Sequence, residues 1–175
     1  MRAGCDLHTP SFAPTQSTYT HPTQSRSLYL QHRQEIADVK QLIYRSEPFG
    51  FDRAALAAIL VGARRNNQRD GITGALICRH DLYLQLLEGS DAAIDALYAR
   101  ITRDDRHDNI RLLLSDTVDR RMFPEWAMLD DEMPSIAWSA AEVAAGAVEA
   151  ATPGALRAVF ERVADTARAR AQPSA

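Results

Sequence analysis

Three groups of uncharged polar residues interrupt apolar segments of this chain. Tyr44 ends one apolar run, and the pair Asn66-Asn67 closes an apolar-faced helical segment. Gln85 interrupts a third apolar run, residues 82–87. A buried phenol or amide costs free energy unless it has a hydrogen-bond partner. Three such groups, each from a different element, therefore predict a shared partner with an array of donors and acceptors, such as a planar heterocycle.

These residue types also suit one kind of chemistry. The Tyr44 phenol has an oxidisable ring and a transferable proton, and an amide such as Gln85 accepts at one end and donates at the other. Each group taken alone has a simpler explanation. Tyr44 suits an ordinary strand, and the Asn66-Asn67 pair suits the end of a helix. Gln85 is the hardest to explain in this way, because an apolar strand seldom contains an amide that lacks a partner.

The hydrophobic periodicity predicts the elements that hold these residues. We expect strands over about 39–45, 71–78, 82–87, 110–118 and 122–129, and helices over about 52–67, 91–101, 139–150 and 153–171. The fold class is then α+β, with a ferredoxin-like βαββαββ core and a five-stranded mixed sheet. Right-handed crossovers place the first two helices on one face of the sheet. The two C-terminal helices either cover the open face or form an interface with a partner.

The chain divides into three predicted parts. Residues 1–38 are rich in Thr, Ser, Pro, Gln and His over most of their length and predict a disordered extension. Residues 39–130 form the core, and residues 131–175 form a helical cap that serves as the output segment.

Composition excludes several classes of protein. The net charge of −3 argues against a general nucleic-acid or anionic-membrane binder. No apolar run approaches the ~20 residues that span a bilayer, and the N-terminus lacks the apolar segment of a secretory signal. The two cysteines, Cys5 and Cys78, fit no usual zinc spacing, and a reducing cytoplasm is the expected location. We expect no metal site.

Five short motifs follow one another through the predicted core. They are Leu42-Ile43-Tyr44-Arg45-Ser46, Arg65-Asn66-Asn67 with Gly71-Ile72-Thr73-Gly74, Gln85-x-Leu87-Glu88-Gly89, Asp104-x-Arg106-His107, and Arg121-x-Phe123-x-x-Trp126-x-Met128. With these motifs in this order, residues 40–130 resemble the BLUF family, the sensors of blue light using flavin. The resemblance covers about half of the chain.

The resemblance implies a role for each polar group around a flavin ring that lies between the two core helices. Tyr44 would donate an electron to the excited flavin, and Gln85 would bridge Tyr44 and the N5 and C4 carbonyl edge of the ring. Asn67 would hold the C4 carbonyl and N3 side, and Asn66 the neighbouring polar edge. Ile72 belongs to the same implied cofactor-binding set.

The later motifs have implied roles as well. Arg106 and His107 would lie near the ribityl or phosphate end of the cofactor. Trp126 and Met128 would sit on the fifth strand and relay the light signal outward. Ala63 stands where the family often has Ser, and this difference is expected to alter the orientation of Trp126 or Met128.

The resemblance therefore implies a blue-light photoreceptor that binds flavin non-covalently, with FAD expected and FMN or riboflavin as alternatives. Light would rearrange the Tyr44–Gln85–flavin hydrogen bonds, without catalysis. The output would be a change of homo-oligomer or an interaction with a downstream signalling protein. One competing hypothesis is a flavin-binding scaffold that does not respond to light. The other is a small enzyme, such as a phosphatase or flavin reductase, although we find no nucleophile–base pair in the sequence.

Overall fold

The computed structural model describes residues 38–48, 53–79, 81–131 and 138–171. In chain order these residues form β1 (Val39–Pro48), α2 (Arg53–Arg69), β2 (Thr73–Cys78), β3 (Tyr83–Gly89), α3 (Asp91–Ile101), β4 (His107–Val118), β5 (Leu129–Asp131), α4 (Ala140–Ala144) and α5 (Pro153–Ala171). The predicted N-terminal extension lies outside the described residues, apart from Asp38. Its expected disorder stays a prediction.

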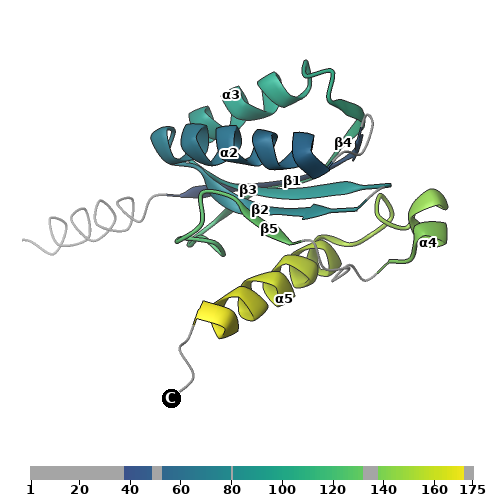
Figure 1. The fold of residues 1–175 in the computed structure, drawn as a ribbon. Helices are drawn as coiled ribbons and strands as arrows, with labels where there is room; N and C mark the ends of the chain where they lie inside the picture. The colour runs from purple at the N-terminus through teal and green to yellow at the C-terminus, as the bar shows by residue number, and fades with distance from the viewer. Residues whose placement is uncertain (1–37, 49–52, 80, 132–137, 172–175) are drawn as a thin grey trace, which may run out of the picture. The chain divides into compact units, whose positions relative to one another are not determined.

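The strands lie side by side in the order β4-β1-β3-β2-β5 (Figure 1). β1 pairs antiparallel with β3 and β4, and β3 pairs antiparallel with β2. The short β5 runs parallel to β2 at the edge. Each core helix thus connects two strands that have a third strand between them, which is the split βαβ arrangement predicted from the element order. The α+β class and the antiparallel four-stranded body of the sheet are confirmed.

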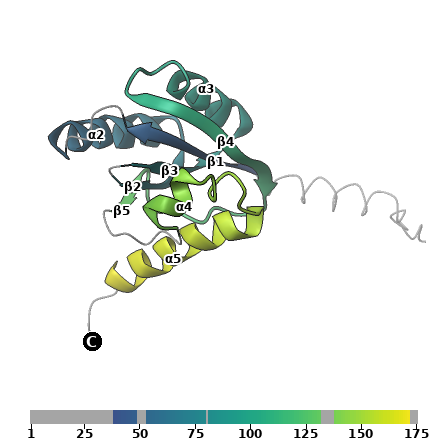
Figure 2. The same ribbon diagram turned by 90° about the vertical axis from the view of Figure 1, so that its right-hand side faces the viewer.

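Both faces of the sheet are covered, and the central strands alternate between two cores. Helices α2 and α3 lie over one face, and α4 and α5 lie under the other (Figures 1 and 2). Leu42 and Tyr44 of β1 belong to the core on the α2–α3 side, whereas Ile43 belongs to the core on the α5 side. Leu86 and Leu87 of β3 divide in the same way. Successive strand residues point to opposite faces, so a strand covered on both faces is apolar throughout.

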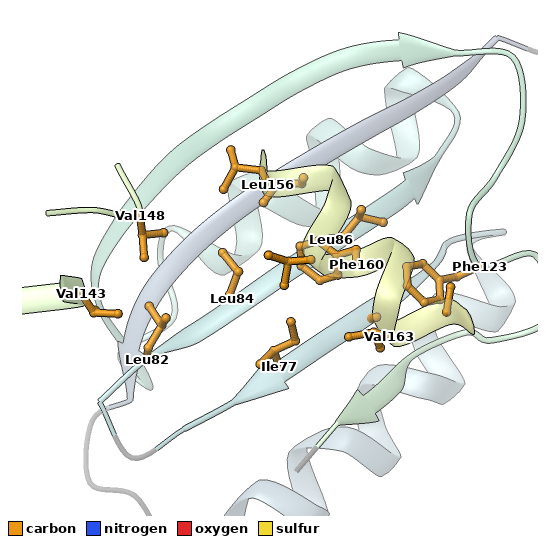
Figure 3. Close-up of a cluster of buried hydrophobic side chains, with 14 residues drawn as sticks. Ile77, Leu82, Leu84, Leu86, Phe123, Val143, Val148, Leu156, Phe160 and Val163 are labelled. Atoms are coloured by element: carbon orange, nitrogen blue, oxygen red, sulfur yellow. The ribbon is translucent and has the colours of Figure 1, made fainter. Parts of the chain in front are cut away.

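The α5 side of the sheet is closed by one long amphipathic helix. The buried side chains of α5 are Leu156, Val159, Phe160, Val163 and Ala164. They pack against strand residues such as Leu84 and Leu86 (Figure 3). The C-terminal segment therefore covers the open face of the sheet, which was the first of its two predicted placements.

The helix predicted over 139–150 is shorter in the structure and ends at Ala144. It starts as predicted, because the Ser139 hydroxyl accepts from the Glu142 N–H and Glu142 caps the Ser139 N–H in return. It ends early because Gly146 adopts a φ of 82°. The Ala147 N–H then bonds to the Glu142 carbonyl and the Gly146 N–H to the Val143 carbonyl, which is a Schellman motif.

The prediction of a strand over 122–129 was wrong for most of that range. The β5 strand starts only at Leu129, and residues 121–128 form turns and bends. The N–H groups of Met122 and Phe123 bond to the Glu88 carboxylate instead of to a strand. Pro124 has no N–H to offer a ladder and suits a turn. A side-chain acceptor and a proline thus replace the expected strand pairing.

Candidate functional site

A cavity of about 440 Å³ lies between α2, α3 and the sheet. Its polar lining consists of Tyr44, Asn66, Asn67, Tyr83, Gln85, Arg100, Asp104, Arg106 and His107. Apolar side chains from α2, α3 and β2 form the rest of the wall, together with Met128. The structure thus brings together most of the residues predicted for a site, from β1, α2, β3 and β4, the loop before β4 and the segment after it.

Tyr44 and Gln85 form the centre of this lining. They are directly opposite each other in the antiparallel pairing of β1 and β3, and both side chains are buried. The Tyr44 hydroxyl donates a hydrogen bond to Gln85 Oε1. Burial raises the pKa of Tyr44 far above its ordinary value, and nearby groups add to this shift. The phenol therefore keeps its proton at neutral pH and remains a donor to the amide.

The other end of the Gln85 amide meets a weak acceptor. Gln85 Nε2 lies 3.4 Å from Met128 Sδ. A thioether accepts hydrogen bonds poorly compared with a carbonyl or a ring nitrogen. The amide of Gln85 is thus anchored firmly at Tyr44 and held loosely at Met128, so a stronger acceptor in the cavity would compete for its N–H.

The C-terminal end of α2 holds the segment that carries Met128. Asn67 Nδ2 donates to the Ala127 carbonyl at 2.9 Å, and Arg64 Nε donates to the Met128 carbonyl at 2.9 Å. The backbone of Asn67 is held in place because its main-chain carbonyl accepts from the Ile72 N–H at 2.8 Å. Its neighbour Asn66 also lines the cavity. The two asparagines therefore sit where a helix end leaves backbone and amide groups available for polar contacts.

Charged groups gather at the α3 end of the cavity. Arg106 Nε donates to Asp104 Oδ1 at 2.7 Å, and a second guanidinium nitrogen bonds to Asp104 Oδ2. The hydrogen bonds from Arg106 hold the pKa of Asp104 at about 2. Arg100 also lines the cavity and lies 3.4 Å from an oxygen of Asp70. This end is suited to a polar, charged extension of a ligand.

His107 lies deeper than the charged groups beside it. Its ring meets Tyr44 and Tyr83 edge-on, with centroid distances of 6.4 and 5.9 Å. Its Nδ1 is 2.9 Å from the Ser46 hydroxyl oxygen. Burial is the main effect on His107 and lowers its pKa below 6.5, against the attraction of Asp104. His107 is therefore neutral at pH 7 and acts as part of the aromatic wall around Tyr44.

This shift predicts a dependence of stability on pH. Below pH 6.5 the unfolded chain binds a proton at His107 that the folded protein resists, so the free energy of unfolding falls as the pH drops. The slope from this group is at most about 1.4 kcal/mol per pH unit. We expect His107→Gln to flatten the dependence between about pH 7.5 and 5.5, measured by urea unfolding. Equal slopes in the two proteins would contradict this prediction. Asp104 does not interfere, because its pKa of about 2 confines its effect to lower pH.

Two of the predicted residues lie outside the cavity lining. Ile72 is buried in the same core as Tyr44 but is not among the lining side chains. Trp126 packs on the opposite core, where its ring meets Phe123 with a centroid distance of 6.2 Å. Trp126 and Met128 therefore face opposite sides of the sheet. They do so because the segment that carries them is turned and is not an extended strand.

Sequence reasoning missed some of the lining. Tyr83 lies two residues before Gln85 on β3, and the period-two alternation of a strand was enough to place both on one face. Two further residues hold parts of the lining without belonging to it. Ser46, which contacts His107, was likewise detectable two residues after Tyr44. Arg64 was not detectable, because its partner is a carbonyl 64 residues away.

Among the described residues, the structure shows no group of three or more His, Cys, Asp or Glu side chains that could hold a metal ion. None of the helices in this part of the chain is both long enough and apolar enough to cross a membrane.

Comparison with curated proteins shows similarity to light-regulated proteins. The chain is 30% identical over 105 residues to the photoactivated adenylate cyclase subunit beta of Euglena gracilis, covering 58% of this chain and 12% of that protein. It is 36% identical over 66 residues to the blue light- and temperature-regulated antirepressor BluF of Escherichia coli strain K12, covering 38% of this chain and 16% of that protein. The chain thus matches only a small part of the length of these relatives.

Solved structures share both the fold and part of the sequence. The dark-state structure of BlrB, a BLUF protein, matches with a TM-score of 0.60 and 26% identity, covering 75% of this chain and 98% of that one. A bacterial light-regulated adenylyl cyclase matches with a TM-score of 0.54 and 33% identity, covering 64% of this chain and 33% of that one. Residues 39–129, more than half of the chain, match the family model described as BLUF, sensors of blue-light using FAD. The chain therefore belongs to the BLUF family.

Proposed function

We propose that this protein senses blue light with a flavin, FAD in its native form, held non-covalently in the cavity beneath α2 and α3. The observation that carries the proposal is the hydrogen bond from the Tyr44 hydroxyl to Gln85 Oε1 in the wall of that cavity. This bond joins an oxidisable phenol to an amide whose donor and acceptor ends can exchange. Membership of the BLUF family supports a flavin as the cofactor and blue light as the stimulus.

The cavity fits a flavin in size and in chemistry. Its volume of about 440 Å³ is within the range of small-molecule sites. Leu56, Leu60 and Leu76 offer apolar surface for the faces of a fused ring. The amides of Asn67 and Gln85 offer donors and acceptors for the ring edge. FMN and riboflavin would use the same ring contacts, so the choice of FAD rests on the family description.

We assign the ends of the cofactor from the polarity of the lining. Asn66, Asn67 and Gln85 would hold the polar edge of the ring. Arg106 would lie toward the charged tail, since it belongs to the polar end of the cavity with Asp104. His107, which contacts the Tyr44 ring, would shape the wall next to the phenol.

The proposed light response uses groups that the structure places in contact. A bound flavin supplies absorption of blue light and an excited state that accepts an electron. Tyr44 releases an electron and passes its hydroxyl proton toward Gln85 Oε1, and both return to Tyr44. During this exchange the Gln85 amide reverses its ends, which the weak Nε2 contact with Met128 Sδ permits. The new hydrogen-bond pattern stores the signal without any net reaction.

We further propose that residues 39–130 are the flavin-binding core and residues 131–175 the output segment. The range of the family model, 39–129, supports this division. The bonds from Asn67 and Arg64 to the Ala127 and Met128 carbonyls support a relay through the segment 121–128, with Trp126 on its far side.

We propose that the output is a change in a homo-oligomer or in binding of a downstream signalling protein. The cyclase and antirepressor names belong to the relatives alone. A cytoplasmic location stays a prediction.

The test is absorption spectroscopy of the purified protein before and after a blue flash. We expect a yellow protein whose flavin spectrum shifts reversibly to longer wavelength, because a reversed Gln85 amide strengthens a hydrogen bond to the flavin carbonyl. Extraction and chromatography of the bound pigment identify the flavin.

Three results would contradict the proposal in different ways. A yellow protein with an unchanged spectrum would indicate a flavin-binding scaffold that does not respond to light. Turnover of NAD(P)H or of an acyl phosphate would indicate a small enzyme. A folded protein that stays colourless with added FAD would remove the cofactor assignment altogether.

A further inference from the structure

Glu88 is a fully buried carboxylate on β3, just beyond the segment that carries Gln85. Its two oxygens accept from the backbone N–H groups of Met122 at 2.7 Å and Phe123 at 2.9 Å. Burying a charge is costly unless it is well hydrogen-bonded. The carboxylate therefore holds the start of the segment 121–128 tightly against the sheet.

A second buried group connects this carboxylate to α5. Gln41 is directly opposite Glu88 in the pairing of β1 and β3, and its Nε2 donates to Glu88 Oε1 at 3.1 Å. Gln41 Oε1 accepts from Arg157 Nε of α5 at 2.8 Å. The Gln41 side chain is thus used at both ends. Arg157 also forms an ion pair with the more exposed Asp116, with 2.6 Å between a guanidinium nitrogen and Oδ2.

The segment that Glu88 holds also reaches the cavity. Phe123 and Trp126 pack in the core that α5 closes, whereas Met128 lines the cavity and contacts Gln85. In the middle, the Trp126 carbonyl accepts from the Gly74 N–H at 3.1 Å. A continuous set of polar contacts therefore runs from Arg157 through Gln41 and Glu88 to this segment, and the segment ends at the Gln85 amide.

We propose that Glu88 is a positioning residue that sets the placement of Met128 against Gln85, and that Gln41 and Arg157 couple this placement to α5. Motion of α5 and motion of the segment 121–128 are then linked through this buried carboxylate, in addition to the direct bond from Arg168 of α5 to the Met122 carbonyl at 2.8 Å. Two groups that share a bonded partner bias each other reciprocally. This coupling between α5 and the segment 121–128 does not require light. Its effect on the photocycle rests on the proposed function.

The experiment measures amide hydrogen exchange by NMR in the dark for the full chain and its variants. Glu88→Gln keeps the shape but loses one acceptor. We expect exchange at Met122 and Phe123 to rise by at least about tenfold, because a bond to a charged group is lost. Gln41→Met leaves the Glu88 carboxylate in place but removes both the bond from Gln41 to Glu88 and the bond from Arg157 to Gln41. We expect faster exchange both at Met122 and Phe123 and in α5 around Arg157.

The matched control is Asp116→Asn, which removes the negative charge of the outer partner of Arg157 but leaves the bond from Arg157 to Gln41. We expect no change at Met122 or Phe123 in this variant. The proposal is overturned if Gln41→Met alters α5 alone, or if Asp116→Asn alters Met122 and Phe123 as strongly as Gln41→Met. Should Glu88→Gln fail to fold, Gln41→Met decides.

The photocycle is measured in the same samples. We expect Gln41→Met to keep the red shift but to change its dark-recovery rate severalfold, because Tyr44 and Gln85 are untouched while Met128 is held less firmly. An unchanged recovery rate would overturn the link to light. A wild-type protein without any red shift would instead overturn the proposed function, and dark exchange would still test the positioning role.

Discussion

Tyr44→Phe is expected to abolish the light-induced red shift completely while leaving a folded, yellow protein. The substitution removes the hydroxyl that donates to Gln85 Oε1 and keeps the buried ring. Without that hydroxyl no proton reaches the Gln85 amide, and a phenyl ring is much harder to oxidise than a phenol. The measurement is the difference spectrum before and after a blue flash, with flavin content determined from the dark spectrum.

Tyr98→Phe is the matched control. The Tyr98 ring lies 5.8 Å from the Tyr44 ring, centroid to centroid, so this variant removes a neighbouring phenol without touching Gln85. We expect it to keep the red shift. A normal red shift in Tyr44→Phe would refute the assigned role of the phenol, and loss of the shift in both variants would point to a general disturbance of the site.

Gly74→Ala is expected to cause the largest loss of stability. A Cβ added to Gly74 would lie 2.0 Å from the backbone oxygen of Leu86 in the neighbouring strand. Neither backbone can move away cheaply, because β2 and β3 are paired and the Gly74 N–H is bonded to the Trp126 carbonyl. Overpacking of this kind lowers the free energy of unfolding by about 3 kcal/mol. Urea unfolding followed by circular dichroism measures it.

Gly154→Ala is the control for this substitution. Gly154 lies near the start of α5, and an added Cβ has no neighbour within 4 Å. Alanine favours the helix over glycine, so we expect no loss of stability and a gain of at most about 1 kcal/mol. If Gly74→Ala unfolds at the same urea concentration as Gly154→Ala, the close approach between β2 and β3 is not as the structure shows.

The periodicity of the sequence was sufficient for the fold class. Strand residues such as Leu42, Ile43 and Tyr44 are apolar without a break, and α5 shows its apolar face at helical spacing. These patterns depend on local geometry, namely the two-residue repeat of a strand and the 3.6-residue repeat of a helix. Periodicity failed over residues 122–129, where the apolar pattern suits a strand but the backbone donors bond to Glu88.

The candidate site was likewise predictable from the sequence only in part. Tyr44, Asn67 and Gln85 stood out in the sequence because a polar group in an apolar segment needs a partner. Their convergence on one cavity depends on the sheet pairing, which places Tyr44 opposite Gln85. Trp126 and Met128 were expected on the fifth strand, but bends at residues 127 and 128 take the place of the strand.

The sequence by itself determined most of the elements and which side chains need polar partners, because both depend on near neighbours in the chain and on the cost of burying a polar group. Only the tertiary structure decided that Glu88 binds the N–H groups of Met122 and Phe123 and that Arg157 reaches it through Gln41. These bonds join residues between 34 and 116 positions apart. No local pattern encodes them, since they exist only once the sheet and α5 are packed together.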